Sequence, residues 1–183
     1  QKKLEELAAI AIDKIPNYLI TALITVIKNN ISKQILDELA SRAIDKISDI
    51  YKFKLLLESI KDKISEEKLE ELASIAIDKM SNDYQITNLL KSIKDKISKE
   101  KLKEFTSKAI DKMSNDYSIN DLLKSIKDKI SEEKLKELTS KAIDKMSNDY
   151  WINDLLKSIK DKISEEKLGQ LASVAINLKN IKR

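Results

Sequence analysis

The sequence has no cysteine and no histidine, and its 183 residues include one glycine and one proline. Without cysteine there is no disulfide, thiolate metal ligand or cysteine nucleophile. Without histidine the Ser-His-Asp, zinc and haem arrangements lose their usual base or ligand. Strands joined by tight turns need many glycines and prolines, so an all-helical chain is favoured. The lack of cysteine fits a reducing compartment, and we expect a cytoplasmic location.

The sequence also lacks the features that other kinds of catalysis need. A single glycine, Gly169, cannot form a phosphate-binding loop. Asp and Glu are abundant, but a catalytic pair of carboxyls needs a cleft whose desolvation shifts their pKa values, and solvated helix faces offer none. We therefore expect no enzymatic activity, no cofactor and no metal site.

Aromatic content and net charge are low too. Aromatic residues make up 4% of the chain, and 35 Lys and Arg against 31 Asp and Glu leave a net charge of +4. The basic residues form no stripe that could neutralise a phosphate backbone, and the few aromatic residues offer little surface for base stacking. Nucleic acid is a disfavoured partner, although a nucleic-acid-binding solenoid stays open as an alternative.

What the chain does contain is a repeat. The triplet Lys-Ile-Ser recurs every 33 residues, at 63–65, 96–98, 129–131 and 162–164. The first copy is one residue shorter, because Pro16-Asn17 replaces Ser-Asn-Asp. The predicted units are 1–29, 30–62, 63–95, 96–128 and 129–161, followed by a half unit at 162–183. Since the sequence starts at Gln1 rather than at a methionine, we expect it to be a piece of a longer chain.

Each full unit carries two apolar stripes with helical spacing. In unit 63–95 the first stripe is Leu69, Leu72, Ala73, Ala76, Ile77 and Met80, and the second is Ile86, Leu89, Leu90, Ile93 and Ile97. Residues three and four apart share one face of an α-helix, so the unit is predicted to be a helical hairpin. Ser65 is the predicted N-cap of the first helix. Lys91, Lys94 and Lys96 gather in the last turns of the second helix, where cations suit the helix C-terminus.

The turn between the two helices has no glycine. It reads Ser81-Asn82-Asp83, in which Asn is expected to take the left-handed conformation that ends a helix and Asp to cap the next helix. The same pair recurs as Asn115-Asp116 and Asn148-Asp149. A ladder of such pairs suggests cation binding as an alternative to capping, but its oxygens lack the spacing of a calcium loop.

Packing between neighbouring units is required for stability. One hairpin buries roughly ten apolar side chains at about 1.5–3 kcal/mol each, which does not offset roughly 1–2 kcal/mol of backbone entropy for each ordered residue. Neighbouring hairpins must therefore share apolar faces. We predict an all-α fold, a right-handed α-α superhelix (solenoid) of stacked antiparallel helix pairs, as a single repeat domain over 1–183.

The hairpin resembles the units of the tetratricopeptide and HEAT-like classes of α-solenoid. Leu69, Leu72, Ala73 and Ala76 follow the large, apolar and small spacing of the tetratricopeptide unit, and the likeness runs from Leu4 to the last helix. Proteins of these classes bind proteins or peptides on a concave face, so the resemblance implies a protein-binding scaffold. Ankyrin repeats share the period, but their Thr-Pro-Leu-His turn is absent.

Variation between near-identical copies indicates candidate contact residues. One position in the first turn of the second helix, off the apolar stripe, is occupied by Lys52, Gln85, Ser118 and Trp151. Trp151 is the only tryptophan, and an exposed tryptophan is a typical anchor for a partner. We interpret this position as a possible contact surface. The alternative is that Trp151 packs over a neighbouring helix.

The second helix of unit 1–29 differs from the others. Its normally polar face carries Leu19, Ala22 and Val26, and a helix that is apolar all round is usually buried on both sides. It is too short to span a bilayer, which needs about 20 apolar residues. Either a preceding segment or its own neighbours cover this face, or it is a dimer or partner contact.

The function predicted from these features is a non-enzymatic helical-repeat scaffold that presents a surface for protein–protein interaction. A protein or peptide is the expected partner, with self-association through the N-terminal unit as a further possibility, and no membrane span is expected. The first alternative is a purely structural spacer or self-assembling array within a larger protein. The second is the nucleic-acid-binding solenoid.

Overall fold

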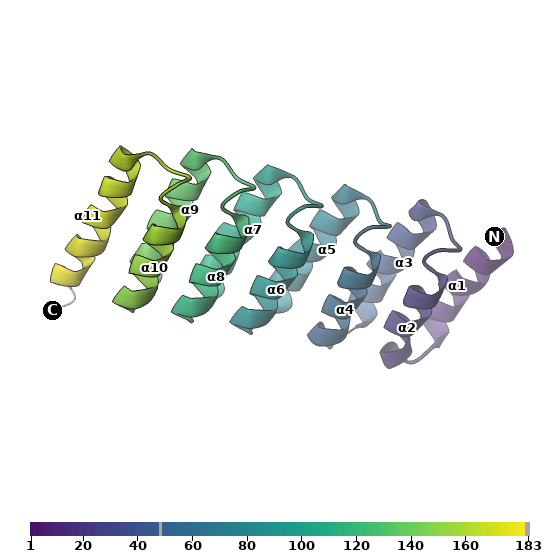
Figure 1. The fold of residues 1–183 in the computed structure, drawn as a ribbon. Helices are drawn as coiled ribbons and strands as arrows, with labels where there is room; N and C mark the ends of the chain where they lie inside the picture. The colour runs from purple at the N-terminus through teal and green to yellow at the C-terminus, as the bar shows by residue number, and fades with distance from the viewer. Residues whose placement is uncertain (48, 182–183) are drawn as a thin grey trace. The chain divides into compact units, whose positions relative to one another are not determined.

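The computed structural model describes residues 1–47 and 49–181, with the backbone alone for 178–181, and these residues form eleven α-helices and no strand (Figure 1). The helices are α1 (Lys2–Lys14), α2 (Asn17–Ile27), α3 (Lys33–Lys46), α4 (Ile50–Ile60), α5 (Glu66–Lys79), α6 (Asp83–Ile93), α7 (Lys99–Lys112), α8 (Asp116–Ile126), α9 (Glu132–Lys145), α10 (Asp149–Ile159) and α11 (Glu165–Ile181). The all-α prediction is confirmed.

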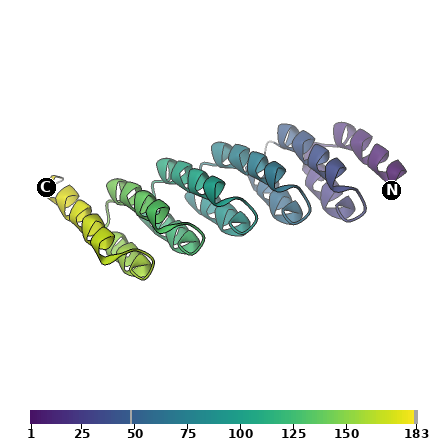
Figure 2. The same ribbon diagram turned by 90° about the horizontal axis from the view of Figure 1, so that it is seen from above.

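The chain forms two compact units, Gln1–Met80 with α1 to α5 and Ser81–Arg183 with α6 to α11. In the first unit α1 packs on α3 and α2 on α4, and in the second α6 packs on α8, α8 on α10, α7 on α9 and α9 on α11. Within each unit the odd and even helices thus form two layers (Figure 2). Each unit is a solenoid-like stack of helix pairs, as predicted. The handedness of a superhelix and the predicted unit boundaries stay predictions.

The predicted apolar stripes form the core. The first stripe, Leu69 to Met80, and the second, Ile86 to Ile97, are buried at every position named above. Their counterparts in α7, α8 and α9 are buried as well. Each helix therefore turns one face inward and leaves its other faces for contacts with neighbouring helices or with solvent.

Polar caps define where the helices begin. The Ser65 hydroxyl accepts a hydrogen bond from the backbone N–H of Lys68 at 3.2 Å, which confirms the predicted N-cap. Ser32, Ser98 and Ser131 cap α3, α7 and α9 in the same way. These hydroxyls satisfy backbone donors that have no partner within the helix.

The predicted roles of the turn residues are wrong. No described residue has a positive φ, so Asn82 does not end α5 in a left-handed conformation. Instead Met80 leaves the helix in an extended conformation with its side chain buried, and Asn82 is the N-cap of α6, accepting from the N–H of Gln85 at 3.0 Å. Because the extended, buried Met80 already turns the chain out of α5, the helix can end without a residue in the left-handed conformation. Asp83 is then the first helical residue and is free to act elsewhere.

Candidate functional site

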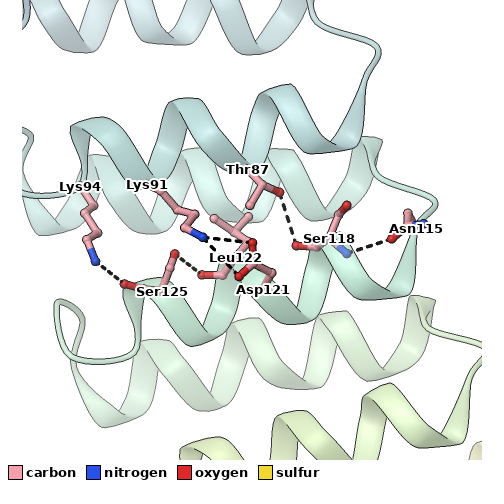
Figure 3. Close-up of polar contacts among 8 residues, drawn as sticks. All are labelled: Thr87, Lys91, Lys94, Asn115, Ser118, Asp121, Leu122 and Ser125. Carbon is pink, nitrogen blue, oxygen red and sulfur yellow. Dashed lines mark hydrogen bonds and ion pairs between the residues drawn. The ribbon is translucent and has the colours of Figure 1, made fainter. Parts of the chain in front are cut away.

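Within each unit a polar ladder joins successive even-numbered helices, and Figure 3 shows it between α6 and α8. Two donors of α6 and its C-cap residue Lys94 meet three acceptors of α8. The Thr87 hydroxyl donates to the Ser118 carbonyl at 3.4 Å, Lys91 Nζ to the Asp121 carboxylate at 3.2 Å, and Lys94 Nζ to the Ser125 carbonyl at 2.7 Å. Lys94 thereby binds a carbonyl in the last turn of α8, where carbonyls lack intrahelical partners and the helix dipole favours a cation.

The same register recurs in both units. In the second unit Lys124 Nζ lies 2.6 Å from the Asp154 carboxylate, and Lys127 donates to the Ser158 carbonyl at 2.7 Å. In the first unit Lys28, the C-cap of α2, donates to the carbonyl of Ser59 in α4 at 2.6 Å. The ladder is therefore a property of the repeat rather than of one helix pair.

Ion pairs in the ladder change the acid-base behaviour of its carboxyls. Lys124, and after it the Asn120 amide, lower the pKa of the Asp154 carboxyl by hydrogen bonding to the charged form. Lys129, 2.5 Å from Asp95, likewise lowers the pKa of that carboxyl. Much of the surface charge is thus directed at neighbouring repeats.

The odd-numbered layer is tied together in a similar way. Between α7 and α9, Lys134 pairs with Glu100 and Lys103 with Glu137, both at 2.5 Å, and Lys141 pairs with Asp111 at 2.6 Å. Four of these residues, Glu100, Lys103, Asp111 and Glu137, line an open hollow over α7 and α9. Because its charges already pair across the hollow, it offers a ligand no cluster of one charge.

In α8 and α10 the predicted contact position lies on the side that faces the preceding even-numbered helix. Ser118 is only 6% exposed, and its carbonyl accepts from Thr87. Lys52 and Gln85 are half-buried. Trp151 in α10 is half-buried too, and its ring packs edge-to-face on Tyr117 of α8 at 5.1 Å. The structure thus shows the packing that was the alternative for Trp151, and a partner contact at this position stays a prediction.

A row of exposed tyrosines was missed by the sequence analysis. Each even-numbered helix has a tyrosine in its first turn, at least half exposed: Tyr18, Tyr51, Tyr84, Tyr117 and Tyr150. The recurrence was visible in the sequence, because a tyrosine stands off the apolar stripe in every full unit. We call Tyr84, Tyr117, Tyr150 and Trp151 of the second unit the aromatic edge.

Within the aromatic edge, the Trp151 ring packs against the rings of both Tyr117 and Tyr150. Trp151 lies 5.1 Å from Tyr117 and 4.8 Å from Tyr150, centroid to centroid, and both contacts are edge-to-face. Tyr117 is 50% exposed and Tyr150 66% exposed. The result is a fixed aromatic cluster that spans two repeats and faces solvent.

The aspartates beside these tyrosines hold the neighbouring turns. Asp83 accepts from the backbone N–H groups of Ser114 and Asn115 at 2.8 and 2.7 Å, and Asp116 accepts from the N–H groups of Ser147 and Asn148. The Asn-Asp pairs therefore cap a helix and fasten the next turn. No group of three or more acidic side chains among the described residues is placed to hold a metal ion.

The three candidate residues of α2 lie on an uncovered face. Leu19 is 40% exposed, Val26 is 76% exposed, and Ala22 between them is exposed as well. On the adjoining helix α1, Leu7 and Ile10 are 54% and 52% exposed. No helix of the first unit covers these side chains, so the alternative in which its own neighbours bury this face is wrong for that unit.

Comparison with known proteins gives no family for this chain: no family model matches it, and neither does any curated protein. Among the described residues, no helix combines the length and the apolar content that crossing a bilayer requires.

Proposed function

We propose that this chain is a non-enzymatic scaffold that binds a protein segment along the aromatic edge. The observation that carries the proposal is the contact of Trp151 with Tyr117 and Tyr150 while both tyrosines stay at least half exposed. Tyrosine and tryptophan are enriched at protein interfaces and dominate their binding energy. Because Trp151 packs against both tyrosines, the three rings would lose little side-chain freedom when a partner binds them.

The charges beside the rings favour a protein over a nucleic acid. An aspartate directly precedes each tyrosine of the edge, as Asp83, Asp116 and Asp149. Carboxylates at this place would repel a phosphate backbone, whereas nucleic-acid grooves combine stacking rings with cations. We therefore propose an uncharged or basic protein segment as the occupant.

The likeness to the tetratricopeptide and HEAT-like classes supports the same function, since those scaffolds bind proteins. It rests on the spacing of apolar and small residues, as at Leu69, Leu72 and Ala73. The expected cytoplasmic location rests on the lack of cysteine alone. Both stay predictions.

One observation favours the alternative of a structural spacer. Ion pairs and hydrogen bonds join neighbouring repeats in both layers, as between Lys124 and Asp154 or Lys134 and Glu100. Side chains used in this way stiffen the stack and are not available to a partner. A spacer needs nothing from the aromatic edge, and this distinguishes the two functions.

A peptide selection tests the proposal. The full chain is immobilised and screened against a displayed library of random peptides, and selected peptides are tested on a Tyr117→Ser/Tyr150→Ser variant. Tyr51→Ser is the matched control, because Tyr51 is an equally exposed tyrosine with Lys52 beside it in place of a tryptophan. We expect binding to be lost in the double variant and kept in the control.

Two results would contradict the proposal. One is a selection that returns no peptide whose binding depends on these rings, which would favour the spacer. The other is binding of a labelled single-stranded oligonucleotide that falls in the same double variant, which would favour a nucleic-acid partner. Thermal unfolding of each variant checks that the fold is kept, as expected for changes at exposed side chains.

A further inference from the structure

The exposed aliphatic side chains of the described residues are concentrated on one helix pair. Of the six large aliphatic side chains that are exposed, four lie on α1 and α2, namely Leu7, Ile10, Leu19 and Val26. We call these four, together with Ala22, the apolar end face. A contiguous group of exposed aliphatic side chains is uncommon on a solvated protein surface and marks an interaction site.

The α2 part of this face occupies the docking positions of the polar ladder. Counted in whole repeats of 33 residues, Leu19, Ala22 and Val26 correspond to Ser118, Asp121 and Ser125 of α8. These α8 residues are the ones that receive Thr87, Lys91 and Lys94 of α6 (Figure 3). The α2 part of the apolar end face is therefore equivalent to a surface that packs against a neighbouring helix elsewhere in the fold, but its side chains are apolar.

Donor and acceptor positions of the ladder vary together. Asp121 pairs with Lys91 and Asp154 with Lys124. In the first unit the equivalent acceptor position in α4 is Leu55, and the equivalent donor position in α2 is Thr25, which hydrogen-bonds to Ser59. Ala22 likewise has no carboxylate to offer. The chain's own α10 carries Lys157 at the donor position, so docking α10 on α2 would press a lysine against Ala22 without its counter-ion. Head-to-tail stacking of this kind is disfavoured.

A second copy of the same face has no such conflict. Helix α2 contains no charged residue between Asn17 and Ile27, so two α2 helices can meet without burying an unpaired charge. On α1, Ile10 takes the place held in α3 by Arg42, which pairs with Asp13 of α1. An ion-pairing residue is again replaced by an aliphatic one. Self-complementary faces of this type are the usual basis of twofold dimers.

We propose that two copies of the chain associate face to face through their apolar end faces. The helices have 13 and 11 residues. Two such helices side by side present a face of roughly 400 Å², about half of the 800 Å² that each partner buries in a standard interface. The dimer is therefore weak and depends on concentration. It uses a different surface from the aromatic edge and does not rest on the proposed function.

Sedimentation equilibrium of the full chain over a concentration series tests the proposal. We expect a monomer–dimer equilibrium in the wild type. Val26→Ser, which installs the serine found at the equivalent Ser59, should weaken the dimer about tenfold or more, because each change occurs twice in a symmetric pair. Leu19→Lys, which installs the residue of Lys52, should do the same by an independent route.

The matched control is Ile176→Ser. Ile176 is an exposed aliphatic residue of α11 outside the end face, so this change should leave the dimer constant unaltered. Circular dichroism checks that the variants keep their helices. The proposal is overturned if the wild type stays monomeric up to about 1 mM, where a contact of this size should populate a dimer. It is also overturned if Val26→Ser and the wild type associate equally, or if the dimer dissociates in high salt as an ion-paired contact would.

Discussion

Helices α2 and α8 occupy the same place in their repeats, but their outer faces differ in chemical character. In α8 the positions Ser118, Asp121 and Ser125 accept three polar contacts from α6. In α2 the same positions carry Leu19, Ala22 and Val26, and they are uncovered. Both helices bury an equivalent inner stripe. The inner stripe thus maintains the fold. On the outer face, Ser118 and Ser125 accept through backbone carbonyls, so only the side chain at the Asp121 position decides whether a lysine finds a counter-ion there.

Truncating the inner stripe should have the largest effect on stability. Leu122→Ala in α8 removes a fully buried side chain and should lower the free energy of unfolding by about 2–5 kcal/mol, through lost burial and a residual cavity. Leu19→Ala on the outer face of α2 should change it by about 0.5 kcal/mol or less. Denaturant unfolding of both variants measures the difference. Similar losses in the two variants would show that the outer face of α2 is buried after all.

Removing a helix cap should have a smaller effect. The Asn115 side chain accepts from the backbone N–H of Ser118 at 3.0 Å, so Asn115→Ala should destabilise the fold by about 1 kcal/mol. The first residues of α2 give the control, because its N-cap is Pro16 and no side chain caps the helix. Asn17→Ala should therefore be nearly neutral in the same unfolding experiment. An equal loss in both variants would argue against the capping role of Asn115.

The repeat, the stripes and the serine caps were predictable because they depend on local sequence. Ser65 caps its own helix, and Leu69 to Met80 share one face whatever the neighbouring repeat does. Contacts between repeats were not predictable in the same way. Lys94 was assigned to the C-terminus of its own helix, but it binds the carbonyl of Ser125 in the next even-numbered helix. Ser118 lies off the apolar stripe and is nevertheless buried. Both depend on the offset between neighbouring hairpins, which no single hairpin sequence determines.

Breaking one ion pair of the ladder should have a still smaller effect. Lys91 and Asp121 are 3.2 Å apart, and both side chains are partly exposed. A double-mutant cycle of Lys91→Met and Asp121→Asn should give a coupling energy of about 0.2–1 kcal/mol that shrinks as salt is added. Thermal unfolding at low and high ionic strength measures it. A coupling energy unaffected by salt would mean that packing, rather than charge, joins α6 to α8 at this point.

The pH dependence of the free energy of unfolding should arise from carboxyls of the polar ladder and not from residues on the outer face of α2. The pKa of Asp154 is lowered in the folded state, chiefly by Lys124, so the unfolded state takes up the proton more readily. The contribution of Asp154 is therefore present at neutral pH and is lost as pH falls below about 4, through the lowered folded pKa. Asp154→Asn should flatten that part of the acid decline in the free energy of unfolding. Ala22, at the equivalent place in α2, has no group that titrates, so Ala22→Ser should leave the decline unchanged. An acid decline of full slope in Asp154→Asn would assign it to other carboxyls, such as Asp95 or Asp128, whose pKa values are lowered by lysines of the next repeat.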